Sequence, residues 1–319
     1  MEPVRWGLLS TARINEVILT GAAKTGTTEI VAVASRHQTR ADDYAREHSI
    51  ARAHGSYEAL LEDDDVEVVY NSLPNSMHVE WSIRALEAGK HVLCEKPLDK
   101  RPGEVERAFD VADSAGRLLM EAFMYRHHPQ TLKLAELVSS GRIGELRNLR
   151  SVFTWMMSDD TDVRLVPELD GGALMDLGCY CISMQRVLAG EPELVMGQQR
   201  VGPTGVDLAF NGILRFAGDV LGEFHCGFDL PEANGIEAIG SEGVAVVPDP
   251  VRCRDPHVLL NGERVDVDDV DRYCLQVENF SAAVRGEAEQ LLGRADALAQ
   301  ARTIAALYRS AESGAAEVP

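Results

Sequence analysis

Three features are missing from this sequence, and each absence excludes a class of protein. No stretch approaches the roughly 18 consecutive apolar residues that a membrane-spanning helix requires, and the N-terminus has no basic segment followed by an apolar one. The six cysteines include no pair with the two-residue spacing of zinc knuckles and redox motifs. We therefore expect a cytoplasmic protein without a membrane anchor, with packed free thiols and no metal site.

Positive charge is also scarce. The sequence has 31 basic and 51 acidic residues, a net charge of −20, and such a field repels phosphate backbones and anionic membrane surfaces. Nucleic acids and membranes are therefore unexpected partners, and a small molecule is the expected ligand. With 319 residues, 45% of them apolar, the chain is long and apolar enough to form about two compact domains.

The first part of the chain alternates short β-branched runs with amphipathic stretches. Strands are predicted at residues 4–9, 29–35, 66–72, 91–95 and 118–122, and helices between them at residues 39–48, 76–88 and 102–115. This alternation is typical of right-handed β-α-β units, which build a doubly wound parallel sheet. Ligands of such sheets bind at the carboxyl ends of the strands, so we expect a cofactor there.

After about residue 125 the pattern changes, which places a domain boundary between residues 124 and 125. Apolar positions alternate with polar ones, including Asp207, on both sides of a turn at Gly218-Asp219, and this predicts an antiparallel hairpin with one apolar face. Further strands are predicted at residues 146–155, 193–201, 235–239 and 244–247, and helices at 172–188, 272–285 and 295–313. The second domain, residues 125–319, is therefore expected to be α+β with a large sheet.

The first predicted strand runs into a turn where dinucleotide-binding proteins carry Gly-x-Gly-x-x-Gly. This turn contains none of those glycines, and small or polar residues stand in their place: Ser10, Thr11, Ala12, Arg13 and Ile14. The small side chains of Ser10 and Ala12 still let backbone approach a pyrophosphate. By pattern alone, an ordinary strand-to-helix turn explains this segment equally well.

The end of the second predicted strand bears on the choice of cofactor. Enzymes that use NAD usually place an acidic residue there for the ribose hydroxyls, whereas this chain has Ser35 and Arg36, followed one turn later by Arg40. A hydroxyl and two guanidinium groups suit a 2′-phosphate, so NADP is favoured over NAD. The alternative is that both arginines are ordinary solvated surface residues.

Two further clusters could carry chemistry. Lys96 follows a predicted strand, at the edge where a parallel sheet meets its ligand, although a surface ion pair between Glu95 and Lys96 also explains it. Asp176 and Tyr180 stand four residues apart in a predicted helix that begins with Gly171-Gly172. A helix-start acid and a packed aromatic ring are the simpler interpretation of that pair.

Four segments together resemble one family of enzymes. Residues 6–14, the Glu95-Lys96-Pro97 tripeptide, residues 121–126 and residues 171–180 stand in the order found in the glucose-fructose oxidoreductase, inositol dehydrogenase and rhizopine-catabolism (Gfo/Idh/MocA) family. The likeness covers nearly the whole chain and is greatest to the branch of dihydrodiol dehydrogenases, NADP-dependent xylose dehydrogenases and sugar 3-ketoreductases. Tyr180 fits that branch, because inositol-dehydrogenase-like members have histidine at the matching position. Loss of the turn glycines fits it too.

The resemblance implies a fold and roles for residues. It implies an N-terminal Rossmann domain that binds NADP, then a substrate-binding domain with an open-faced, mainly antiparallel sheet through which homodimers or homotetramers form. The C-terminal helices can pack back on the first domain. It further implies that Lys96 is catalytic, that the Lys96-Pro97 bond is cis and that Tyr180 is the acid/base. Matching positions that imply contact with cofactor are Asn71, Leu73, Pro74, Asn75, His78, Glu95, Pro97 and Arg164, and those that imply contact with substrate are Arg126, Trp155 and Tyr180.

The chemistry of hydride transfer agrees with such a pair. When a carbonyl carbon gains a hydride, the developing alkoxide must be protonated by a positioned acid. A free tyrosine has a pKa near 10, and lowering that pKa to about 7 requires roughly 4 kcal/mol. One ammonium group at about 4 Å supplies about that much at an effective dielectric constant of 20. Lys96 is therefore sufficient to tune Tyr180, with Asp176 orienting substrate hydroxyls or the lysine.

The sequence thus predicts an NADP-dependent dehydrogenase that acts on a CH–OH group of a sugar or diol. Reduction of a nucleotide-linked or other keto sugar is the alternative within enzymes, because residues do not fix the direction of reaction. A dinucleotide-binding sensor that has lost its chemistry is the alternative outside enzymes, and retention of both Lys96 and Tyr180 argues against it.

Overall fold

A computed structural model describes residues 2–319, and the chain divides into two compact units. The first contains the residues up to 99 together with 103–124 and 271–298, and the second contains 100–102, 125–270 and 299–319. Each unit is built on its own sheet.

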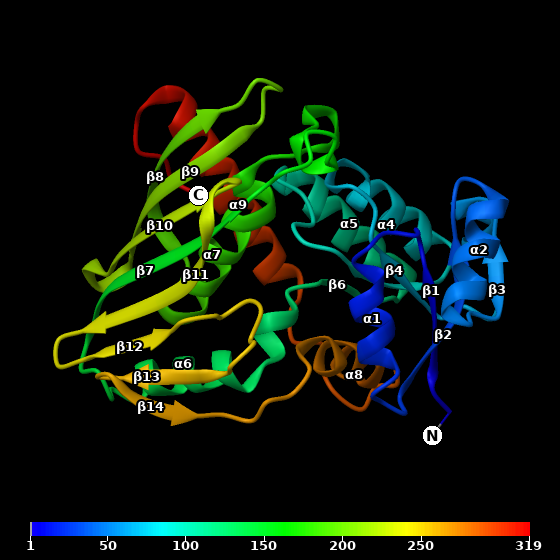
Figure 1. The fold of residues 1–319 in the computed structure, drawn as a ribbon, viewed down its shortest axis with the longest axis horizontal. Coiled ribbons are helices and arrows are strands. Elements are labelled where there is room, and N and C mark those ends of the chain that lie inside the picture. Colours follow the sequence, from blue (N-terminus) through cyan, green and yellow to red (C-terminus); the bar gives the residue numbers. More distant parts are fainter. Residues whose placement is uncertain (1) are drawn as a thin grey trace. The chain divides into compact units, whose positions relative to one another are not determined.

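The sheet of the first unit has six parallel strands in the order β3-β2-β1-β4-β5-β6 (Figure 1). This confirms the doubly wound parallel sheet expected from the sequence. The short strand β3 was not predicted, because its three residues include no long apolar side chain. The strands are β1 (Val4–Leu8), β2 (Thr28–Ala34), β3 (Arg52–His54), β4 (Val68–Asn71), β5 (His91–Cys94) and β6 (Leu119–Glu121).

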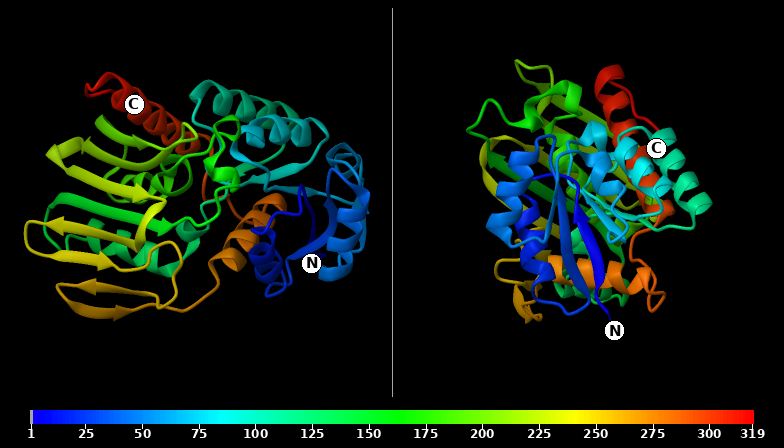
Figure 2. Two further views of the ribbon diagram at one scale, coloured as in Figure 1. Left: turned by 45° about the horizontal axis from the view of Figure 1, so that its top comes forward. Right: turned by 90° about the vertical axis from the view of Figure 1, so that its right-hand side faces the viewer.

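A helix from late in the chain completes the first unit. Helix α8 (Arg272–Val284) packs against α1 (Asn15–Ala22), as Figure 2 shows. A Cβ at Gly21 would lie 2.8 Å from the backbone nitrogen of Cys274, so only glycine permits this approach. Trp6, which is fully buried, donates from Nε1 to Ser281 Oγ at 3.1 Å. The other helices are α2 (Gln38–His48), α3 (Tyr57–Leu61), α4 (His78–Glu87) and α5 (Pro102–Ala115).

The sheet of the second unit has eight strands in the order β14-β13-β12-β11-β7-β10-β9-β8. All its neighbours are antiparallel except β7 and β10, which confirms a large and mainly antiparallel sheet. The predicted hairpin is the β9–β10 pair, but the four-residue strands β13 and β14 were not predicted, and β14 is mostly charged. The strands are β7 (Leu146–Met156), β8 (Pro192–Val201), β9 (Asp207–Phe216), β10 (Leu221–Gly227), β11 (Asp229–Gly240), β12 (Val244–Val247), β13 (His257–Leu260) and β14 (Glu263–Asp266).

Helices cover one face of this larger sheet. Helices α6 (Pro129–Ser139) and α7 (Cys179–Ala189) pack on it, where Phe210, Leu214 and Phe224 are buried. The opposite face is open and carries exposed residues such as Ile213. Helix α9 (Arg294–Ser313) ends the fold. Between residues 2 and 319, no helix is both long and apolar enough to cross a membrane.

Candidate active site

The turn after β1 is held by side-chain hydrogen bonds in place of the missing glycines. Asn15 is fully buried, donates from Nδ2 to the carbonyl oxygen of Ser10 at 2.6 Å and accepts from Ser72 Oγ at 2.7 Å. The hydroxyls of Ser10 and Ser72 lie 2.8 Å apart, and Ser10 Oγ accepts from the backbone nitrogen of Ala12 at 3.0 Å. Ser72 was not identified from the sequence, because its contacts join two strands 62 residues apart.

This turn leads into a helix start suited to an anion. No side chain caps the N-terminus of α1, which begins after Ile14. The backbone N–H groups of Asn15, Glu16 and Val17 donate to the preceding turn, so the partial positive charge of the helix start is what favours an anion here. Thr11, Ala12 and Arg13 line the same turn, and the guanidinium of Arg13 is exposed.

The residues after β2 form the next part of the same sheet edge. Ser35 is buried, and its backbone nitrogen donates to the carbonyl oxygen of His54 at 3.0 Å. Arg36 and Arg40 are exposed, and over residues 2–319 neither forms an ion pair within the protein. Both guanidinium groups act on the pKa of the Tyr57 phenol, which burial raises and these two positive charges lower. The two arginines therefore share one neighbourhood and remain available to an anion.

The loop after β4 is tied down by buried polar groups. Asn71 is fully buried and donates from Nδ2 to the carbonyl oxygen of His78 at 3.0 Å and to Ser82 Oγ at 3.1 Å. His78 is buried with Nε2 2.7 Å from the carbonyl oxygen of Leu73 and Nδ1 2.8 Å from that of Pro97. Burial lowers the pKa of His78, so the neutral form is favoured. His78 thus links this loop, which includes Pro74 and Asn75, to the turn after β5.

The turn after β5 carries Lys96. The Lys96-Pro97 peptide bond is cis, as the resemblance implied. Glu95 Oε1 accepts from the Tyr70 hydroxyl at 2.5 Å, and the backbone nitrogen of Leu98 donates to Glu121 Oε1 at 2.8 Å. Lys96 is half-buried. Ser10, Ser35, Asn71 and Lys96 therefore follow or end β1, β2, β4 and β5, at one edge of the parallel sheet.

Tyr180 belongs to the second unit and stands in the first turn of α7. Its side chain is buried between two aromatic rings, with centroids 5.8 Å from Tyr125 and 5.7 Å from Phe153, both edge-on. The Tyr125 hydroxyl donates to Ser183 Oγ at 2.7 Å. These contacts fix the plane of the Tyr180 ring. Phe153 was not identified from the sequence, although its place on the apolar face of β7 is the signal that could have found it.

Asp176 lies in a π-helical turn, Leu174–Gly178, that immediately precedes α7. The sequence predicted one regular helix over residues 172–188, and the structure corrects this, because the first turn is wider than an α-helical one. Asp176 Oδ2 accepts from Arg164 Nε at 2.8 Å, and Arg164 Nη1 also bonds Asp162 Oδ1 at 3.2 Å. The two carboxylates raise the pKa of Arg164, which therefore stays charged.

The predicted substrate residues Trp155 and Arg126 lie in the second unit as well. The Arg164 guanidinium carbon is 6.0 Å from the centroid of the Trp155 ring, which joins Trp155 to the Asp176 ion pair. Arg126 is half-buried, and its Nη1 lies 3.4 Å from Ser183 Oγ. Asp176, Arg164 and Trp155 thus form one connected group, and Tyr180 and Arg126 form a second one through Tyr125 and Ser183.

One functional neighbour contradicts the sequence pattern. Asp207 was predicted on the polar, exposed side of β9, but its side chain is buried. Its carboxylate accepts from the backbone nitrogen of Leu174 at 2.7 Å and from the Tyr308 hydroxyl at 2.9 Å. Alternation failed at this position because two buried donors satisfy the carboxylate.

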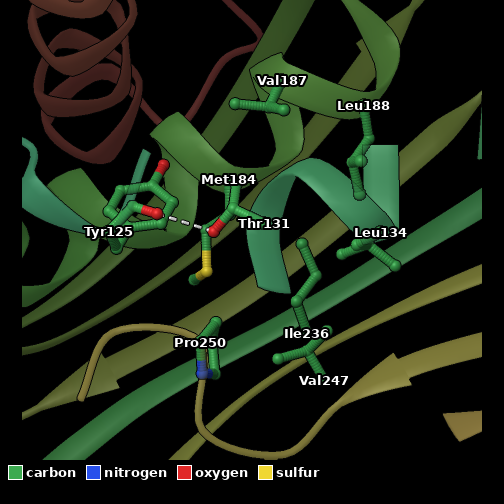
Figure 3. A pocket seen from close by; sticks show the side chains of 9 residues that line it. All are labelled: Tyr125, Thr131, Leu134, Met184, Val187, Leu188, Ile236, Val247 and Pro250. Atoms are coloured by element: carbon green, nitrogen blue, oxygen red, sulfur yellow. Dashed lines mark hydrogen bonds between the residues drawn. The ribbon is translucent and has the colours of Figure 1, made fainter. Parts of the chain in front are cut away.

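An apolar pocket lies beneath α7, as Figure 3 shows. Its free volume of about 10 Å³ is at most the space of one water molecule, so it is no substrate pocket. Thr131 Oγ1 donates to the carbonyl oxygen of Tyr125 at 2.8 Å beside it. Within residues 2–319 we find no cluster of three or more His, Cys, Asp or Glu side chains able to hold a metal ion.

Comparison with known proteins identifies both parts of the chain. Residues 5–123 match the model of an oxidoreductase family with an NAD-binding Rossmann fold, and residues 131–246 match the model of the GFO/IDH/MocA C-terminal domain. Over 320 aligned residues, the chain is 37% identical to a D-xylose 1-dehydrogenase (NADP(+)) of Haloferax volcanii, with 98% of each chain covered.

Other relatives have different substrates. A trans-1,2-dihydrobenzene-1,2-diol dehydrogenase of Bos taurus is 34% identical, over 82% of this chain and 78% of that protein. The crystal structure of KijD10, a 3-ketoreductase from Actinomadura kijaniata in complex with NADP and TDP-benzene, is 33% identical. It superposes with a TM-score of 0.91, covering 97% of this chain and 98% of that one.

Proposed function

Because this chain belongs to the Gfo/Idh/MocA family of oxidoreductases, we propose that it is an NADP-dependent dehydrogenase acting on a CH–OH group of a sugar or diol. When bound, the nicotinamide takes or returns the hydride. The residues of the chain itself bind the nucleotide, orient the substrate and move the proton. The observation that carries the proposal is the combination of a lysine at the edge of the Rossmann sheet with Tyr180 on α7.

The nucleotide-binding part of the proposal is supported by the first unit. The start of α1 supplies a partial positive charge for the pyrophosphate, and Ser10 is small enough for close approach. Arg36 and Arg40 are exposed, unpaired in the protein and near each other, as the 2′-phosphate of NADP requires. These residues fit NADP better than NAD, because no acidic side chain follows β2 to accept from ribose hydroxyls.

Proton transfer is assigned to Tyr180. During oxidation its phenolate oxygen takes the proton of the substrate hydroxyl, and during reduction its hydroxyl returns one. Lys96 holds a positive charge that favours the phenolate and bonds the substrate oxygen. Tyr125 and Phe153 hold the Tyr180 ring edge-on, which limits its movement while the proton moves.

The direct test is a kinetic comparison of the wild type with Tyr180→Phe. The wild type is assayed with NADP against pentoses, hexoses and diols by absorbance of the reduced nicotinamide. Tyr180→Phe removes the transferable proton and keeps the ring contacts, so we expect turnover to fall at least a hundredfold while NADP still binds. Turnover within a few-fold of the wild type contradicts the assignment of Tyr180.

Reduction of a nucleotide-linked keto sugar is the second candidate, favoured by the likeness to KijD10. The two candidates differ in the substrate, since a keto sugar with NADPH is reduced while a free aldose with NADP is oxidised. Running both assays on one preparation decides between them. If NADP binds and neither class of substrate reacts, a dinucleotide-binding sensor replaces both.

We further propose that copies of the chain associate through the open face of the larger sheet. Met196 on β8 lies directly opposite Ile213 on β9, so two exposed apolar side chains stand together. Exposed Leu221 on β10 lies opposite Arg215, diagonal to Ile213. Covering these apolar side chains is favourable. Sedimentation should report a dimer or tetramer, which Ile213→Glu weakens and the exposed control Val163→Glu does not. A monomeric wild type contradicts this proposal.

The reaction is proposed to take place in the cytoplasm. All six cysteines are free, and five of them are buried. Thiols persist in reducing compartments, so this pattern supports the assignment. Fractionation of the source cells, with the protein detected by antibody, tests it.

A further inference from the structure

A buried carboxylate sits against the start of the helical segment that leads to Tyr180. Asp207, the first residue of β9, is only 3% exposed. Its Oδ2 accepts from the backbone nitrogen of Leu174 at 2.7 Å, and the carboxylate also bonds the backbone of Ala173. A Cβ at Gly172 would lie 2.2 Å from Asp207 Oδ1, and Gly172 has a φ of +125°. Only glycine admits the carboxylate at this place.

The helical segment depends on this outside acceptor. Neither the π turn Leu174–Gly178 nor α7 has a side-chain cap from its own N-terminal residue. The first N–H groups of a buried helix need acceptors, and leaving them unpaired costs about 1–3 kcal/mol each. Asp207 supplies the acceptor from a strand that is distant in sequence, and the partial positive charge of the helix start favours its negative charge.

A second element fixes the carboxylate itself. The Tyr308 hydroxyl, on α9, donates to Asp207 Oδ1 at 2.9 Å. Burial and the neighbouring carboxylate raise the pKa of Tyr308 well above its ordinary value, so this phenol keeps its proton and acts as a donor. Lys100 Nζ lies 5.8 Å from the centre of the Tyr308 ring and 2.7 Å from Asp170 Oδ1. The C-terminal helix is therefore coupled to the Gly171-Gly172 turn.

From these contacts we propose that Asp207 is a positioning residue: by capping the Leu174–Gly178 turn, it fixes where Asp176 and Tyr180 stand. The Asp207 carboxylate is buried and occupied by Leu174 and Tyr308, so it acts through the helical segment. This inference rests on the proposed function, because it assigns Asp207 a share in the turnover that Tyr180 performs. Loss of a merely structural residue lowers the amount of folded protein. Loss of Asp207 lowers the turnover of each folded molecule.

The ionised form of Asp207 is the one that caps. Its surroundings supply donors: the N–H groups of Ala173 and Leu174 and the hydroxyl of Tyr308, with the Cys226 thiol as the other titratable neighbour. Burial raises the pKa of Asp207 to about 6, and these donors limit the rise. Below that pH the carboxyl is protonated, so one of its oxygens carries a hydrogen and acts as a donor, which weakens its role as a hydrogen-bond acceptor. Turnover should therefore have an acidic limb near pH 6.

The test compares three variants of the full chain. Asp207→Ala leaves the N–H groups uncapped, whereas Asp207→Asn retains an acceptor for them and an amide donor for the Tyr308 oxygen. Ser310→Ala is the matched control, because Ser310 is buried on the same helix but bonds Gly197 and Ala315 instead. Each variant is assayed well below its melting temperature for kcat, substrate KM and NADP affinity.

Asp207→Ala is expected to lower kcat at least twentyfold with NADP affinity within twofold of the wild type. Asp207→Asn is expected to recover kcat to within threefold and to abolish the acidic limb near pH 6, and Ser310→Ala to leave kcat unchanged. A kcat within twofold of the wild type in Asp207→Ala overturns the proposal. So does an equal loss of kcat in Ser310→Ala, which would assign the effect to stability alone.

Hydrogen exchange separates this inference from the proposed function. The Leu174 amide should exchange faster in Asp207→Ala than in the wild type and Asp207→Asn, whatever reaction the protein catalyses. If the Leu174 amide exchanges equally fast in Asp207→Ala and the wild type, Asp207 does not cap this amide and the inference is overturned. A wild type that caps Leu174 but oxidises or reduces no sugar or diol overturns the proposed function, and with it the role of the cap in turnover.

Discussion

Arg164 Nε donates to Asp176 Oδ2 at 2.8 Å, which joins the loop after β7 to the π turn before α7. The Asp176 carboxylate is largely buried, whereas the Arg164 side chain is 41% exposed. Asp162 bonds the same guanidinium, so the ion pair is part of a small network. The sequence singled out Asp176 and Arg164 for separate roles, and the structure shows that they interact directly.

We expect the two residues to act as a unit. A double-mutant cycle of Asp176→Ala and Arg164→Ala should give a coupling free energy of about 1 kcal/mol in urea unfolding. Burial of Asp176 makes this coupling larger than that of a typical exposed pair, and the partial exposure of Arg164 limits it. Either single variant should lower kcat/KM at least tenfold, and the double variant little further. Additive losses of kcat/KM would show that the residues act independently.

His78 should stabilise the two loops that it joins. A neutral imidazole has one N–H, so it donates to only one of the carbonyl oxygens of Leu73 and Pro97 at a time. His78→Leu leaves both carbonyls without that donor in a buried place, and we expect the free energy of unfolding to fall by about 1–3 kcal/mol. The exposed control His37→Leu should change it by less than about 0.5 kcal/mol. Equal melting curves for His78→Leu and the wild type would contradict this.

Arg36 should determine the choice of nucleotide. A hydrogen bond to a charged group contributes about 1.5–3 kcal/mol, so Arg36→Ala should lower the ratio of kcat/KM for NADP over NAD by about 10–150-fold. Arg46→Ala is the matched control, because Arg46 lies on the adjoining helix α2 but is already paired with Asp43. An unchanged ratio in Arg36→Ala would refute phosphate recognition by this residue, as would a wild type that prefers NAD tenfold.

The sequence predicted the fold well because hydrophobic periodicity is strong in long elements. Helix α5 has the predicted bounds, and so does strand β12. The hairpin of β9 and β10 was found because its alternation spans two strands of seven and ten residues around a glycine turn. Length alone does not explain the missed strands, because β5 and β12 also have four residues. Strands β3 and β14 consist mainly of charged and polar residues, which give no apolar pattern.

The site was predictable only in part. Motif order and family likeness identified Lys96 and Tyr180, but not the side chains that hold them. Ser72 and Asp207 act through contacts with residues distant in sequence, and a single sequence does not report such contacts. Asp207 was misplaced for a physical reason, since a buried carboxylate looks like an exposed one until its donors are known. Whether Lys96 and Tyr180 act on one substrate oxygen remains a prediction for the kinetic test.

His91 and Asp207 should change stability with pH in opposite directions. Leu118 donates its backbone N–H to His91 Nδ1 at 3.0 Å, which requires that nitrogen to be unprotonated, and burial lowers the pKa of His91 to about 4. The unfolded chain then binds a proton near pH 6.5 while the folded one does not, so this stabilisation is complete above pH 6.5 and is lost as pH falls through 4. Burial raises the pKa of Asp207 to about 6, so the folded chain keeps this proton at pH values where the unfolded chain has lost it. The resulting contribution to the free energy of unfolding is complete below the ordinary pKa near 4 and is lost as pH rises through 6.

Two variants separate these effects in urea unfolding between pH 7 and pH 4.5. His91→Gln keeps an acceptor but does not titrate, so its free energy of unfolding should fall by about 1–2 kcal/mol less than that of the wild type over that interval. This figure is lower than the shift would give at about 1.4 kcal/mol per pKa unit, because His91 is only partly buried. Asp207→Asn removes the opposing contribution, so its stability should fall more steeply than that of the wild type as pH decreases. If both variants shift the slope in the same direction, burial does not set the pKa of at least one of these groups, and the electrostatic account of that site is wrong.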